Sequence, residues 1–112
     1  MDLLEEMNKL IKELDYSVKH LRENGTALAE AEKNYKICLM EQALKLRAEQ
    51  DMPVTLINQI IYGIKEVATL RFERDVKEAT YLANQEAINS TKLKIRILEN
   101  QLNREYSIPA TN

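Results

Sequence analysis

The fold is decided by the longest stretch of the sequence without Gly or Pro, which reads IKEVATLRFERDVKEATYLANQEAINSTKLKIRILENQLNREYSI from Ile64 to Ile108. Apolar residues recur in it at the three- and four-residue intervals of a helix face. Residues 92–98 alternate as in a strand, but a lone strand would leave its backbone edge unpaired. A helix of roughly forty residues is about 60 Å long, whereas a compact domain of about 100 residues has a radius of gyration near 13 Å. The sequence therefore predicts a long last helix that needs another helix beside it.

The chain has two Gly and two Pro residues, and each separates periodic segments or precedes the tail: Gly25, Pro53, Gly63 and Pro109. Asn24-Gly25 is typical of a helix end, and Thr26 and Thr55 are typical N-caps. We expect helices over 2–23, 27–50, 55–62 and 65–106, with a flexible tail over 107–112. A break near residues 89–91 is left open. These segments predict a single all-α domain over 1–112, an elongated antiparallel helical hairpin or bundle with coiled-coil character and three to four helices.

The composition is that of a soluble helical domain, with 45% apolar and 30% charged residues. The net charge of −2 is too weak to attract a polyanion by bulk electrostatics. A single cysteine excludes an internal disulfide and fits a reducing compartment. No apolar run is long enough to cross a bilayer, and the first residues are acidic where a secretory signal is basic. We therefore expect a cytoplasmic protein that does not act at a membrane.

Two side chains are candidates for catalysis, His20 and Cys38. Ser17 stands where a di-iron helix motif would place Glu, so we expect His20 to be an ordinary surface or interface residue. Cys38 stands between two apolar residues, where burial raises the thiol pKa and suppresses reactivity. No zinc spacing or phosphate loop accompanies either residue. The sequence therefore predicts a protein that is not an enzyme and that has no cofactor or metal site. Catalysis by Cys38 or His20 is a third hypothesis, which ranks behind two non-enzymatic ones.

The first helix carries a heptad pattern that indicates self-association. Six apolar residues alternate at intervals of three and four: Leu4, Met7, Ile11, Leu14, Val18 and Leu21. Ile11 and Val18 then occupy a positions and leucines occupy d positions, the combination typical of a parallel two-stranded coiled coil. Leu3 and Leu10 fall on g positions, where such a dimer prefers charges, so packing onto a bundle explains the pattern equally well. We expect this seam to join copies of the chain into a dimer or higher oligomer.

The second predicted helix has two adjoining apolar strips. One comprises Leu28, Ala31, Tyr35, Cys38, Leu39 and Leu46, and the other comprises Ile37, Met40 and Leu44. Because a helix buries each apolar strip against a different neighbour, this helix is expected to contact two neighbours.

Basic residues gather near the end of the chain. Residues 1–90 carry twelve basic and sixteen acidic side chains, whereas residues 91–112 carry Lys92, Lys94, Arg96 and Arg104 against Glu99 and Glu105. These four cations are candidate nucleic-acid contacts, because oligomerisation would multiply a weak basic patch. Nucleic acid is nevertheless not the favoured partner.

Several motifs between residues 44 and 88 carry a resemblance to a known group of proteins. They are Leu46-Arg47-Ala48-Glu49, Pro53-Val54-Thr55-Leu56-Ile57, Leu70-Arg71-Phe72-Glu73-Arg74-Asp75-Val76 and Asn84-Gln85-Glu86-Ala87-Ile88. This block resembles small all-helical proteins of unknown function encoded by phages and prophages of Gram-positive bacteria. The resemblance implies an accessory or host-directed interaction role in the bacterial host cytoplasm, and it transfers no site residues. Tyr62-Gly63 gives a weaker resemblance to the hairpin turn of secreted type VII proteins.

Two function classes follow from these observations. The first is a non-enzymatic helical interaction or assembly protein of a phage or prophage, a homo-oligomer that also binds a protein partner of unknown identity. The alternative is an oligomeric nucleic-acid-associated accessory factor in phage replication or recombination.

Overall fold

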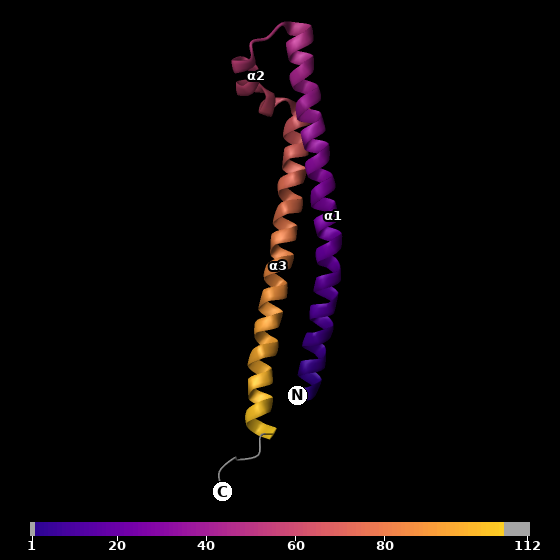
Figure 1. The fold of residues 1–112 in the computed structure, drawn as a ribbon, viewed down its shortest axis with the longest axis vertical. Coiled ribbons are helices and arrows are strands. Elements are labelled where there is room, and N and C mark those ends of the chain that lie inside the picture. Colours follow the sequence, from indigo (N-terminus) through magenta and orange to yellow (C-terminus); the bar gives the residue numbers. More distant parts are fainter. Residues whose placement is uncertain (1, 107–112) are drawn as a thin grey trace. The chain divides into compact units, whose positions relative to one another are not determined.

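The computed structural model describes residues 2–106, which form three α-helices and one 3-10 turn and contain no strand. Helix α1 comprises Leu3–Gln50, α2 Val54–Ile60, the 3-10 turn η1 Ile61–Gly63, and α3 Lys65–Tyr106 (Figure 1). The predicted all-α class with a long last helix is confirmed. The predicted tail over 107–112 lies outside the described residues.

Helix α1 is one helix of 48 residues, so the predicted interruption at residues 24–26 is wrong. Gly25 lacks the positive φ of a glycine that ends a helix. A Cβ atom at Gly25 would lie at an ordinary contact distance of 3.4 Å from the Tyr81 ring, so this part of α1 packs against Tyr81 of α3. Thr26 is accordingly an interior helix residue and not an N-cap. Gly25, which the sequence pattern assigns to a helix end, thus lies inside a helix at a packing contact with Tyr81.

The N-terminal end of α1 is capped by Asp2. The Leu4 backbone N–H donates to Asp2 Oδ1 at 3.1 Å, which satisfies an amide that the helix itself leaves unpaired. Glu5 and Glu6 in the first turn add negative charge next to the positive end of the helix dipole. The beginning of α1 therefore follows from its local sequence.

The connection between the long helices begins where the sequence predicts. α1 ends at Gln50, and Asp51 adopts a left-handed φ of 47°, which Asp tolerates better than most residues. Arg47 Nη1 donates to the Met52 carbonyl at 2.9 Å and holds the chain against the helix end. Pro53 then precedes α2 as its N-cap, so the predicted cap at Thr55 is wrong.

The chain divides into two compact units. The described residues of unit 1 are 2–22 and 82–106, and unit 2 comprises Glu23–Tyr81. Each unit therefore takes one segment from α1 and one from α3, and unit 2 also contains α2 and η1.

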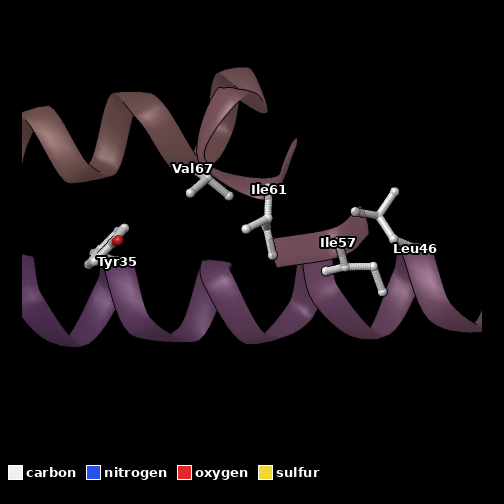
Figure 2. Packing of buried hydrophobic residues seen from close by; sticks show 5 residues of the cluster. All are labelled: Tyr35, Leu46, Ile57, Ile61 and Val67. Atoms are coloured by element: carbon white, nitrogen blue, oxygen red, sulfur yellow. The ribbon is translucent and has the colours of Figure 1, made fainter. Parts of the chain in front are cut away.

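Unit 2 is held together by a buried apolar cluster. It brings together residues of α1, α2, η1 and α3: Tyr35, Leu46, Ile57, Ile61 and Val67 (Figure 2). Val67 is fully buried, and the Arg74 guanidinium lies 4.7 Å from the centre of the Tyr35 ring. The short connection is thus folded back onto α1 because Ile57 and Ile61 need cover from water.

Unit 1 is an antiparallel helix pair. Leu10 shares a hollow with Leu98, and Leu21 shares another with Ile88, so residue numbers rise along α1 as they fall along α3. Asn84 Nδ2 donates to the Ser17 carbonyl at 3.0 Å and so joins a side chain of α3 to the backbone of α1.

Helix α3 is continuous through residues 89–91, which settles the break that the sequence leaves open. The buried Thr91 hydroxyl donates to the Ala87 carbonyl at 2.9 Å, one turn earlier in the same helix. Thr residues can interrupt a helix by bonding to nearby backbone groups, but the Thr91 hydroxyl forms its hydrogen bond within α3.

Candidate functional site

The predicted oligomer seam is divided between two surfaces of unit 1. Met7, Leu14 and Leu21 are half-buried, on the side of α1 that also carries Leu10, which is 8% exposed. The other three seam residues are 43 to 54% exposed and recur at seven-residue intervals: Leu4, Ile11 and Val18, which we call the outer stripe. The six residues therefore do not form one surface for a partner.

The side of α1 that faces α3 is marked by a contact between the two helices. Leu10 and Ile11 are both apolar, so the sequence does not determine which of them faces α3. Asn84 Nδ2 of α3 donates to the Ser17 carbonyl of α1 at 3.0 Å, so Ser17 lies on the side of α1 that faces α3. Leu10, seven residues earlier, is buried on the same side, whereas Ile11 and Val18 are exposed.

Unit 2 has a second exposed apolar stripe on α1. Ile37, Met40 and Leu44, which we call the Met40 stripe, are 49 to 66% exposed. The first predicted strip of this helix is buried or packed against the cluster, through Tyr35, Cys38, Leu39 and Leu46. Within unit 2 this strip of α1 packs against both α3 and the connection formed by α2 and η1, whereas the Met40 stripe lacks a cover within the unit.

An open groove of about 550 Å³ lies between the two long helices of unit 2. It is lined by Ala27, Glu30, Ala31 and Asn34 of α1 and by Phe72, Glu73, Val76 and Lys77 of α3. The small side chains Ala27 and Ala31 leave room between the helices, and Phe72 is 68% exposed at the edge. Sequence reasoning missed this groove, although Ala27 with Ala31 and Phe72 with Val76 are each four residues apart.

His20 is engaged in an aromatic contact in unit 1. Its ring centre lies 4.2 Å from that of Tyr16, with the two planes inclined by 58°. The described residues contain no group of three His, Cys, Asp or Glu side chains that could hold a metal ion.

Cys38 is half-buried in unit 2 and packs against the apolar cluster. Burial raises the pKa of the thiol above its ordinary value of 9.0, and the negative charges of Glu41 and Glu66 raise this pKa further. A raised pKa leaves less thiolate at neutral pH, which opposes use of Cys38 as a nucleophile.

The four candidate nucleic-acid contacts do not share one face of α3. Lys92 lines a hollow with Leu21 and Gln85, whereas Lys94 lines a different hollow with Glu6. At about 100° per residue, side chains two positions apart point to nearly opposite sides of a helix. Lys92 and Arg96 lie four residues apart and do share a side of α3.

Comparisons with protein-family models, with curated proteins and with solved structures find no match to this chain. Among the described residues, no helix combines the length and the apolar character needed to cross a membrane.

Proposed function

We propose that this protein is a non-enzymatic helical interaction protein that binds another protein through an exposed apolar face of α1. The Met40 stripe carries this proposal. Its three large apolar side chains lie on one side of a helix whose opposite side already packs against the cluster of unit 2. Apolar residues at such spacings are the anchors by which helices bind grooves or other helices.

The thiol and imidazole environments support a non-enzymatic role. Cys38 is packed against the apolar cluster with a raised pKa, and His20 is in a tilted ring contact with Tyr16. A protein partner would therefore bind exposed surface other than Cys38 and His20. The resemblance of residues 44–88 to phage and prophage proteins supports an accessory role in a phage or prophage programme in the bacterial cytoplasm.

The proposal is tested by capture of partners from native cells with three forms of the full chain. Met40→Glu places a charge in the centre of the Met40 stripe, and Ala68→Glu places the same charge at an exposed position of α3 in the same unit. We expect the unaltered chain and Ala68→Glu to retain the same protein, and Met40→Glu to lose it at least about tenfold, the size of effect that an interface anchor shows.

Circular dichroism of both variants checks that the helices are retained. A set of captured proteins that is unchanged by Met40→Glu would contradict the proposal. Retention of no protein by the unaltered chain would contradict it as well.

A further inference from the structure

The methionine side chains of the described residues differ in their access to water. They are Met7, Met40 and Met52. Met7 and Met52 are half-buried, and Met52 packs against the cluster of unit 2. Met40 is 66% exposed, so its thioether sulfur is open to reagents dissolved in water. Of these three methionines, Met40 is therefore the one that a dissolved oxidant reaches most readily.

Met40 lies on the side of α1 that points away from the cluster of unit 2. At about 100° per residue, it is turned around the helix by about 140° from Tyr35 and by about 120° from Leu46, which are both buried in the cluster. Ile37 and Leu44 are three and four residues away and share its side of the helix. A chemical change of the Met40 side chain therefore alters an exposed surface and leaves the packed side of α1 in place.

We propose that Met40 is a site of reversible oxidation by hydrogen peroxide, and that its sulfoxide turns the Met40 stripe from an apolar into a polar surface. The thioether sulfur attacks one peroxide oxygen, so that an S–O bond forms while the O–O bond breaks. The hydroxide that leaves takes up the proton of the transferred oxygen. Sulfur is thereby oxidised to the sulfoxide, and the peroxide is reduced to water.

The oxidation is reversible because sulfoxides of methionine can be reduced enzymatically, with one reductase for each sulfoxide epimer. In the reduction, two thiols of a dithiol are oxidised to a disulfide, and the sulfoxide oxygen leaves as water. The Met40 side chain then regains its apolar character. Both directions act on an exposed side chain, so neither requires the cluster of unit 2 to open.

The sulfoxide also releases a bound protein, and this step rests on the proposed function. The Met40 side chain is flexible and polarisable, which suits it to an apolar interface. Its sulfoxide introduces a polar oxygen, and a polar group that is buried without a hydrogen-bond partner weakens the association. A protein bound to the Met40 stripe covers the sulfur, so the free chain is the form that is oxidised.

Cys38 can be distinguished from Met40 by its chemistry and its position. It packs against the cluster, and burial together with the charges of Glu41 and Glu66 raises the pKa of its thiol. Peroxide oxidises thiols through the thiolate, which is scarce at about pH 6, whereas a thioether has no proton to lose. Treatment at that pH therefore favours oxidation of the methionines over oxidation of Cys38.

The first test is peptide mapping by mass spectrometry after limited treatment of the full chain with hydrogen peroxide at about pH 6. We expect sulfoxide to form several-fold faster at Met40 than at Met7 or Met52, and circular dichroism to stay unchanged while Met40 alone is oxidised. Equal rates at the three methionines, or a loss of helix when only Met40 has reacted, would overturn the proposal.

The second test measures release of the protein that the unaltered chain captures. After limited oxidation, we expect the unaltered chain and Met7→Leu to hold this protein at least about fivefold more weakly. Met40→Leu keeps an apolar side chain of similar volume without the sulfur, so it should hold the protein equally well before and after treatment. Sulfoxide reductases with dithiothreitol should restore binding to the unaltered chain. Release of the same size from oxidised Met40→Leu would assign the effect to another residue and overturn the proposal.

The two tests distinguish failure of this inference from failure of the proposed function. Peptide mapping needs no partner, so it decides whether Met40 is the oxidised residue even if Met40→Glu leaves the set of captured proteins unchanged. If Met40→Glu loses the captured protein but the sulfoxide of Met40 does not, the proposed function stands and release by oxidation is wrong.

Discussion

Gly25 gives the sharpest test of the fold at the scale of one residue. Its φ is not positive, and a Cβ atom there would meet the Tyr81 ring at an ordinary contact distance of 3.4 Å. Alanine is favoured over glycine inside a helix, so we expect Gly25→Ala to raise the free energy of unfolding by about 0.5 to 1 kcal/mol. Urea denaturation followed by circular dichroism measures this change.

The alternative interpretation of Gly25 predicts the opposite sign. If a helix ended at Asn24-Gly25 in a left-handed conformation, alanine would be strained there and would lower the stability. Gly63→Ala serves as a comparison, because Gly63 also lacks a positive φ and a Cβ atom there would meet nothing within 4 Å. A destabilised Gly25→Ala protein would therefore contradict the continuous helix.

Cys38 provides a prediction about pH. Since burial and the nearby Glu41 and Glu66 raise its pKa in the folded protein, the unfolded chain loses the thiol proton first as the pH rises. The folded state then binds more protons, so the free energy of unfolding should fall as the pH rises through the ordinary thiol pKa of 9.0 and above.

Alkylation with iodoacetamide measures the pKa shift of Cys38 directly. We expect the rate to rise with pH at a midpoint above 9.0, and to be lower at neutral pH than the rate of a free cysteine. A midpoint below that value would contradict the described environment of Cys38. Glu66→Gln should move the midpoint downward, because it removes one of the negative charges that oppose the thiolate.

At the scale of the elements, Val67 is the buried residue that α3 contributes to the cluster of unit 2. It is fully buried, and Val67→Ala removes two methyl groups from the cluster. We expect a loss of about 2 kcal/mol in the free energy of unfolding, from the transfer of these groups and the space left behind. Val76→Ala in the same helix is the control, because Val76 is 45% exposed and its truncation should change stability by less than about 0.5 kcal/mol. Equal effects of the two substitutions would contradict the placement of the core.

The helix boundaries show how much of the fold the sequence determines. The end of α1 is predicted closely from Pro53 and the residues before it. Pro53 and Asp51, which has a positive φ, both affect the backbone next to them in the sequence. The residues Asn24-Gly25-Thr26 mislead, because their role depends on Tyr81, which is distant in the sequence. Local signals therefore locate the end of α1, but they misplace the cap of α2 and do not distinguish a glycine inside a helix from one that ends it.

The candidate surfaces were predictable in part. The spacing of Ile37, Met40 and Leu44 predicts the second apolar strip of α1, and all three side chains are exposed. The spacing predicts the six residues of the oligomer seam. Which of the six are half-buried and which are exposed depends on whether Leu10 or Ile11 faces α3. The packed side also carries the hydrogen bond from Asn84 to the Ser17 backbone, a contact between distant residues that periodicity within one helix does not reveal.

At the scale of the whole molecule, the charge distribution predicts weak interaction with nucleic acids. The net charge is −2, and the hollows that contain Lys92 and Lys94 lie apart on α3. We expect no salt-dependent binding of single- or double-stranded DNA in fluorescence anisotropy at low ionic strength. Tight binding that weakens steeply with salt, and that Lys92→Gln with Arg96→Gln abolishes, would contradict this expectation and favour the nucleic-acid hypothesis.

The contact between Ser17 and Asn84 also has a consequence during synthesis of the chain. The two residues are 67 positions apart, and ribosomes add about 5 to 20 residues per second, so Asn84 is made roughly 3 to 13 s after Ser17. In that interval both apolar faces of the first α1 segment lack the α3 segment of unit 1. The apolar residues of α1 that face α3 in the folded unit are therefore uncovered during this interval, before the helix pair can close.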